Sequence, residues 1–401
     1  MSNTFEFIGK IVPCKKTDKF NPCGVDKFPK GDWGKKYIKF NVVSGFNRHM
    51  VEVSTLVNVT NPNSQSIYTF TKGEVNSDGT RGKGSSLVVP FDDRFNQDIV
   101  EQVASFRKFV IDTEISGRRT KLENALNNFK EGTVTDEEMT ELNVNSLKEC
   151  EEALEKSNNR KHVFISEYDF IDCLEKVLSS DKIKNMKFKV TGDYTLEYSD
   201  KKDSWYRHFN VKRVYRVADS TEDVSQANFN FVFKEDCVDD SKFDDTKKMK
   251  VAGYIPQYLS QFKETFFAPF EFTLDGGENE KKALAFKKKF DFPVEYEGEY
   301  REIGIVCDVL NGSPTVELTE DMLTAEQKEN LEYGFCTMED IKSEINKDIK
   351  GERIVDLVIS KLARGYSNGS EPTVYKESDF SKPHNKELEN IDEDIFADDD
   401  I

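Results

Sequence analysis

Residues 4 to 59 constrain the fold more strongly than any other part of this 401-residue chain. An apolar run at 4 to 12 leads into a long loop rich in lysine, glycine and aromatic residues. Two more runs follow, at 36 to 43 and 50 to 59, with a Gly-Phe-Asn turn between them. Aromatic and β-branched residues dominate these runs, which is typical of strands. We therefore predict three consecutive strands, joined first by a basic loop and then by a tight turn.

The second of these strands has two different faces. Because successive side chains of a strand point in opposite directions, Ile38 and Phe40 share one face. Tyr37 and Lys39 share the other. The first face suits a hydrophobic core, and the second offers a ring and a cation to a ligand.

Charge distinguishes this region from the rest of the chain. Residues 1 to 50 contain ten Lys or Arg and four Asp or Glu, which gives +6, whereas the whole chain is at -18. A basic zone within an acidic protein favours a specific anionic partner. Aromatic residues are interleaved with these cations, at Phe20, Phe28, Trp33, Tyr37 and Phe46.

Cations beside flat rings are typical of single-stranded nucleic-acid binding, because cations contact phosphates while bases stack on the rings. The alternative is that the rings belong to the core and the lysines form a solvated rim. The sequence leaves both interpretations open.

Length and composition set further limits. A chain of this length can form two or three domains. It contains no run of 18 apolar residues, and its first residues lack the features of a secretory signal. Seven scattered cysteines fit a reducing compartment. We therefore expect a cytoplasmic protein with no membrane contact, made in the host cytoplasm if it is viral.

We predict neither a cofactor nor a metal. Cys14 and Cys23 are not in a CxxC pair and have no pair of histidines nearby, which favours free thiols over zinc. The acids between 236 and 245 are more typical of a solvated charged loop than of a metal site. The glycine-rich segment 79 to 84 lacks phosphate-loop spacing, so it is either a basic loop along a phosphate backbone or an exposed hairpin.

Changes in periodicity divide the chain into five parts. Segments with strand periodicity and segments with helical periodicity occur in different parts, so we expect an α+β chain. One of the predicted helices is the segment 353 to 364, whose apolar residues have the spacing of an amphipathic helix. The strand-rich segment at 181–315 either completes a β-barrel begun by the N-terminal strands or forms a second barrel. The predicted parts are N-terminal strands and basic loops (1–91), a helical insertion (92–180), a second strand-rich region (181–315), C-terminal helices (316–366) and a disordered acidic tail (367–401).

A second basic and aromatic zone lies in the second strand-rich region. Residues 201 to 216 contain six cations and one acid, together with Trp205, Tyr206 and Tyr215. A long strand with outward arginines there would extend the first binding surface. The alternative is an ordinary sheet edge protected by charge.

The last fifteen residues hold eight acids and no cation, and apolar residues are spaced among them. Such a segment is typical of a docking motif, and it would also compete for the protein's own basic groove. We assign partner binding to Asp394, Ile395, Phe396, Asp398, Asp399, Asp400 and Ile401.

The run YIKFNVVSG, the turn into RHMVEV and the acidic end ADDDI resemble bacterial and bacteriophage single-stranded DNA-binding proteins. The resemblance covers roughly the first 60 and the last 15 residues. It implies an OB-fold-like β-barrel core that holds single-stranded DNA, and a tail that recruits replication, recombination and repair proteins. The chain is longer, has a helical middle and ends in isoleucine rather than proline-phenylalanine, which favours a viral version.

These observations predict a non-catalytic protein that coats and protects single-stranded DNA and that can also self-associate. The predicted phosphate contacts are Lys15, Lys16, Lys30, Lys35, Lys36, Lys39, Arg48, Arg207, Lys212, Arg213 and Arg216. The predicted stacking residues are Trp33, Tyr37, Phe46, Trp205, Tyr206 and Tyr215.

Two other functions stay open from the sequence. One is a structural or scaffolding protein of a virus, in which the basic zones form the rim of an interface. The other is a metal-dependent nuclease, whose acids would converge only in three dimensions. No Ser-His-Asp, Cys-His or HExxH arrangement is present, and the four histidines are far apart in the sequence.

Overall fold

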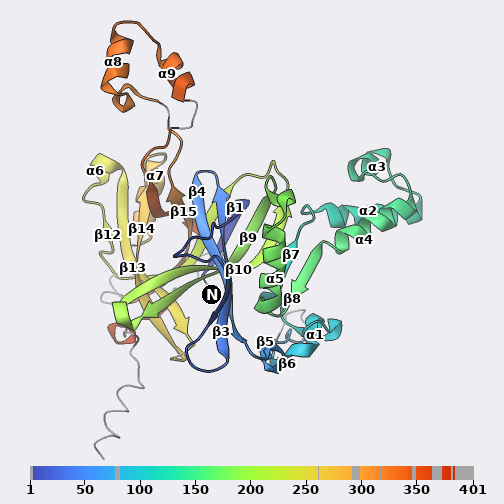
Figure 1. Ribbon diagram of the computed structural model, residues 1–401. Coiled ribbons are helices and arrows are strands. Elements are labelled where there is room, and N and C mark those ends of the chain that lie inside the picture. The colour runs from blue at the N-terminus through green and yellow to red at the C-terminus, as the bar shows by residue number, and fades with distance from the viewer. Residues whose placement is uncertain are drawn as a thin grey trace, which may run out of the picture.

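The computed structural model describes residues 3–76, 82–260, 262–290, 299–316, 318–345, 349–363, 373–380 and 383. Within this part the chain is α+β, as predicted, with one large mixed sheet and helices at its margins (Figure 1). A separate hairpin, β5 (Ser66–Phe70) and β6 (Ser86–Pro90), lies off this sheet.

The three strands predicted at the amino end are confirmed as β1 (Thr4–Pro13), β3 (Trp33–Ser44) and β4 (Asn47–Asn58). The basic loop also contains a short strand, β2 (Cys23–Lys27), which pairs with β3. Gly45 makes the β3–β4 turn with a φ of 58°, a left-handed conformation that glycine adopts without steric cost.

Five strands form a first closed circuit of pairings. β1 pairs with β3, β3 with β4, β4 with β10, β10 with β9, and β9 with β1. The β4–β10 pairing is parallel, and the other four are antiparallel. Helix α5 precedes β9 and packs against β3 and β4. The remaining bounds are β9 (Lys187–Ser199), β10 (Ser204–Val217) and α5 (Glu167–Leu178).

Five later strands repeat this pattern. β11 pairs with β13, β13 with β14, β14 with β16, β16 with β15, and β15 with β11. Again the pairing of the third strand with the last is parallel and the others are antiparallel. The bounds are β11 (Val224–Phe233), β13 (Lys248–Leu259), β14 (Glu264–Asp275), α7 (Glu280–Lys287), β15 (Tyr300–Gly312) and β16 (Ile354–Leu362).

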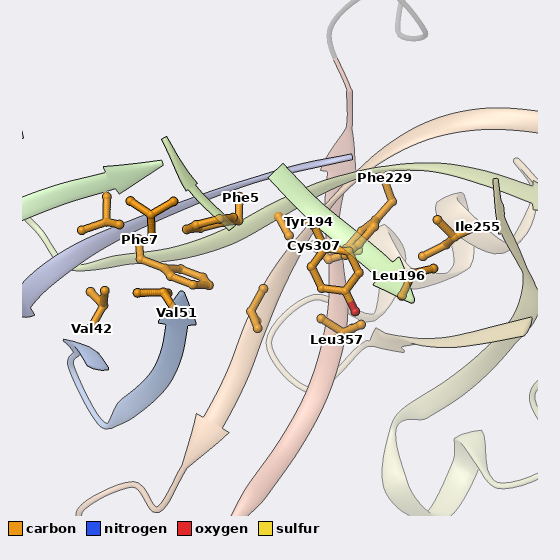
Figure 2. Close-up of a cluster of buried hydrophobic side chains, with 14 of the residues drawn as sticks. Phe5, Phe7, Val42, Val51, Tyr194, Leu196, Phe229, Ile255, Cys307 and Leu357 are labelled. Atoms are coloured by element: carbon orange, nitrogen blue, oxygen red, sulfur yellow. The ribbon is translucent and has the colours of Figure 1, made fainter. Parts of the chain in front are cut away.

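The two circuits are joined edge to edge and through a common core. β1 pairs with β11 from Thr4↔Asn228 to Ile8↔Val224, and β4 meets β15 at one pair. Figure 2 shows buried side chains of both circuits side by side. The rings of Tyr194 and Phe229, one from each circuit, have centroids 4.9 Å apart. Because buried residues of both circuits form one cluster, the two circuits stabilise each other.

The region predicted as a helical insertion contains helices and two strands. Residues 109–112, within the region predicted to be helical, form a buried strand that pairs with β10. Helices α2, α3 and α4 project from the sheet with a small core of their own (Figure 1). The bounds are α1 (Gln97–Gln102), β7 (Phe109–Asp112), α2 (Arg118–Glu131), α3 (Asp136–Leu142), α4 (Leu147–Asn158) and β8 (Lys161–Phe164).

The helix predicted at 353 to 364 is wrong, because residues 354–362 form strand β16. Its apolar residues fit both periods, but Leu357 and Ile359 alternate into the core between β15 and β14. Two helices, α8 (Ala325–Glu332) and α9 (Met338–Ile345), do form in the preceding part of 316–366 and project from the sheet (Figure 1).

The remaining elements are small. The short strands and helix are β12 (Val238–Asp239), α6 (Phe243–Thr246) and β17 (Val374–Tyr375). The disordered tail predicted at 367–401 is therefore wrong for 373–380, where β17 pairs with β15. Short 3-10 helices span Pro62–Ser64, Phe91–Asp93, Ser105–Arg107, Asp181–Ile183, Asp200–Lys202, Glu320–Met322 and Glu377–Asp379. Among the described helices, none has both the length and the apolar character needed to cross a membrane.

The aromatic core gives a stability prediction. Phe7 is fully buried and stacks on His49 with centroids 4.1 Å apart. Replacing Phe7 by alanine leaves a cavity, so we expect the free energy of unfolding in urea to fall by about 3–5 kcal/mol. Val88→Ala, at a position 53% exposed, is the control and should change it by less than about 0.5 kcal/mol. Equal effects of the two substitutions would contradict the assigned core.

Candidate nucleic-acid interface

The predicted binding residues differ widely in exposure. Eight of the seventeen are exposed, seven are half-buried and two are buried. The exposed ones are Lys15, Lys16, Lys30, Trp33, Phe46, Arg48, Tyr206 and Arg207; the half-buried ones are Lys35, Lys39, Trp205, Lys212, Arg213, Tyr215 and Arg216.

Lys36 and Tyr37 are corrected by the structure. The Lys36 ammonium lies 2.6 Å from the Asp172 carboxylate and 3.3 Å from the centre of the Tyr168 ring, so it fixes α5 to β3. The Tyr37 ring is 7% exposed, and its hydroxyl donates to Asp26. Burial raises the pKa of Tyr37. A ring enclosed in this way does not fit base stacking, and an ammonium paired in this way does not fit phosphate contact.

Several half-buried cations have protein partners. Lys39 lies 3.2 Å from Glu52, and Lys212 lies 2.5 Å from Asp193. Arg213 donates to the carbonyl oxygen of Ser105. These cations are held in place along β3 and β10, and a polyanion would have to compete with their carboxylate partners.

Two of the exposed rings lie toward opposite ends of β3. Trp33 begins β3 and Phe46 follows its end, and eleven steps at about 3.3 Å each place Trp33 about 36 Å from Ser44. One base cannot contact both rings. Since β4 and β10 are parallel, the start of β10, with Tyr206, lies toward the Phe46 end.

A groove that the sequence did not indicate lies on the β4–β10 side of the first circuit. Its volume is about 510 Å³, and strand β5 of the hairpin and the segment before β7 line it. Three of its apolar side chains are well exposed, Tyr68 at 78%, Leu56 at 60% and Phe106 at 56%. Rings left in water at the edge of a groove are available to stack on a flat ligand.

Cations accompany these rings. The Arg107 guanidinium lies 4.9 Å from the Phe70 ring centre and 5.6 Å from that of Phe106, and Lys212 also lines the groove. A groove of this size with rings, cations and a few polar groups fits a nucleotide, whose base is flat and whose phosphate is anionic, or another flat, anionic ligand. Glu167 lies at the base of the groove, where burial raises the pKa of its carboxyl.

A hydrogen-bonded network holds β4 to β10 beside this groove. The two strands share a single pair, Asn210↔Glu52. His208 Nδ1 lies 2.7 Å from a Glu52 oxygen, and Lys39 approaches the other oxygen. The hydrogen bond from His208, with smaller contributions from charge and Lys39, lowers the pKa of Glu52 to about 2. The network therefore reinforces the pairing that closes the first circuit.

Strand alternation could have indicated the groove residues. In the hairpin strand 66–70, Tyr68 and Phe70 share one side, while Ile67 and Thr69 face the other. Strand alternation could not have indicated the exposed Phe106, because this residue follows a helix and lies in a 3-10 turn.

Other candidate chemistry is limited in the described part of the chain. Within 3–76, 82–260 and the later described ranges, no three His, Cys, Asp or Glu side chains group as a metal site. All seven cysteines are free thiols. The partner-binding residues predicted in the tail, 394 to 401, lie outside the described residues.

A comparison of the chain with known protein families, with curated proteins and with solved structures found no match.

The Glu52 network gives a prediction for stability and pH. The Glu52 side chain is 10% exposed, and its folded pKa is below the unfolded value of 4.5. The stabilisation that the ionised Glu52 carboxylate gives the folded protein is therefore fully present above pH 4.5 and is lost as the pH falls toward 2. We expect Glu52→Gln to lower the free energy of unfolding by about 1–3 kcal/mol at pH 7.

Denaturation of both proteins at pH 7 and pH 3 tests this. The difference between wild type and variant should shrink at the lower pH. A difference that stays constant would show that the Glu52 charge does not stabilise the fold.

Proposed function

We propose that this chain is a non-catalytic single-stranded DNA-binding protein built on two OB-folds in tandem. An OB-fold is a five-stranded, partly open Greek-key barrel that binds oligonucleotides on the face of its second and third strands and in flanking loops. The observation that supports this most directly is the pairing order, which is the same in both circuits.

The pattern fits that fold in detail. In each circuit the first strand pairs with the second and the fourth, and the third pairs in parallel with the fifth. A helix lies between the third and fourth strands of each, α5 in the first and α7 in the second. Both circuits thus have four antiparallel pairings, one parallel pairing and a helix between the third and fourth strands. This repetition supports two copies of one fold.

The groove of the first circuit is the proposed base-binding site. Tyr68 and Phe106 would stack on bases, and Arg107 would contact the phosphates between them. The strand would continue along β10 toward its start, where Tyr206 and Arg207 are exposed. This path includes the second basic zone. Tyr68 of the β5–β6 hairpin takes the stacking role that the sequence had assigned to Tyr37.

The acidic tail completes the proposal. By its resemblance to the tips of bacterial and bacteriophage single-stranded DNA-binding proteins, residues 394 to 401 would recruit proteins of replication, recombination or repair. Its charge supports this assignment, since an acidic segment with apolar anchors is a common docking motif. The proposed setting is the cytoplasm of a host cell during phage DNA replication.

The test is a fluorescence titration with labelled oligo-dT at several salt concentrations. Affinity should fall steeply with salt, because phosphate contacts release counterions. Stacking contributes about 1–3 kcal/mol per base, so the double variant Tyr68→Ala/Phe106→Ala should bind at least roughly 30-fold more weakly. Tyr333→Ala is the matched control, since Tyr333 is 62% exposed in the projecting α8–α9 segment.

Other results would contradict the proposal in distinct ways. An affinity that does not depend on salt, or equal losses in the double variant and in Tyr333→Ala, would exclude the groove as the site. Large self-assembly without binding of oligo-dT would favour a scaffolding protein. Degradation of the oligonucleotide on addition of magnesium would favour a nuclease.

A further inference from the structure

The outer face of β13 and β14 in the second circuit is aromatic and covered. Tyr254 on β13 lies opposite Pro269 on β14, and Pro256 lies opposite Phe267. These four side chains alternate with core residues such as Ile255 and therefore face away from the core. In the proposed OB-fold this is the face of the second and third strands, where such folds bind their ligands.

A segment from much later in the chain lies on this face. Phe380 packs on three rings, with centroids 4.2 Å from Tyr300, 4.4 Å from Phe267 and 4.7 Å from Tyr254. Its ring is tilted by 33–36° from those of Phe267 and Tyr300. Phe380 thus occupies the position that a base would take between Tyr254 and Phe267.

The segment 373–380 is held by a short strand pairing, hydrogen bonds and ring contacts, among them the hydrogen bond that the Glu302 amide donates to the Thr373 carbonyl oxygen. β17 pairs with β15 over only two residues. Two phenols donate to carboxylates, Tyr300 to Glu377 and Tyr375 to Glu302. This segment contributes a strand of only two residues and two packed rings, Phe380 and Tyr375, whose centroid lies 5.1 Å from that of Phe267. None of these contacts belongs to the pairings that close the second circuit, so the segment can leave without breaking them.

Cations and an open cavity adjoin the covered face. The cavity has a volume of about 540 Å³ and is lined by Tyr254, Tyr300 and Phe270. The Lys234 ammonium lies 5.8 Å from the Tyr300 ring centre. The Arg207 guanidinium of the first circuit lies 4.1 Å from the Phe270 ring centre. Rings and cations are therefore combined here, as in the groove of the first circuit, and the carboxylates of Glu235 and Glu271 also line the cavity.

We propose that the β13–β14 face is a second site for single-stranded DNA and that segment 373–380 is a displaceable cover over it. This inference rests on the proposed function. When the cover leaves, bases stack on Tyr254 and Phe267, and the carboxylates of Glu377 and Asp379 move away from the incoming phosphates. Arg207 lies at the junction, so one strand can pass from β10 into the adjoining cavity.

Strand length decides whether the cover opens. A short oligonucleotide fills the groove of the first circuit and does not reach the second. A longer one, once bound there, presents its free end to the second face at high effective concentration. The stacking that it gains offsets the ring contacts of Phe380 that it displaces.

The first experiment compares two lengths of oligo-dT, about 8 and about 30 nucleotides, since one OB-fold covers about 4–16 nucleotides. Phe380→Ala should bind the longer one about tenfold more tightly than wild type, the effect of roughly one additional stacked base. Its affinity for the shorter one should not change. Adding Phe267→Ala to Phe380→Ala should abolish the gain.

A second measurement uses the wild-type protein, so it does not depend on how the variants fold. Trypsin cleaves after Lys376, which lies within the cover. The 30-nucleotide strand should increase the rate of this cleavage at least severalfold, and the 8-nucleotide strand should leave it unchanged.

The outcomes separate this inference from the function on which it rests. If neither length binds wild type or variant, the proposed function fails and the second site with it. If both lengths bind but Phe380→Ala gains nothing on the longer strand, or the longer strand does not accelerate cleavage after Lys376, Phe380 is a permanent part of the core and the second site is excluded.

Discussion

Strand β1 pairs with three others, and both circuits depend on it. Its residues 4–8 lie between β9 and β11, and from Lys10 onward it pairs with β3. Gly9 lies at the change of partner, where an added Cβ would come within 2.1 Å of the Val43 carbonyl oxygen. Only a residue without a side chain permits this approach, so one strand can close the first circuit and join it to the second.

The local structure around β1 could be predicted from the sequence, but its pairing partners could not. Runs of aromatic and β-branched residues identified β1, β3 and β4, and the basic and aromatic zone at 201–216 indicated β10. The closing pairs, Asn210↔Glu52 and Thr273↔Val358, join strands far apart in the chain and leave no local pattern. For the same reason the sequence could not decide between one barrel and two.

Residue type alone did not predict which cations and rings are exposed. Cations and rings are enriched near the amino end, yet Lys36 and Tyr37 belong to the packing between β3 and its neighbours. The strand segment 354–362 was predicted as a helix because its apolar residues fit both a helical and a strand period. What decides between the two is the position between β15 and β14, which is a tertiary property.

The helical arm of α2, α3 and α4 leaves the sheet and returns to it at neighbouring positions, because Asp112 pairs with Lys161. At its base Arg119 binds Asp112 and the Ser157 carbonyl oxygen, while the arm's interior packs on itself. The arm is thus a modular insertion. Because both ends of the arm lie on neighbouring strands, its length and surface can change without altering the register of β7 and β8.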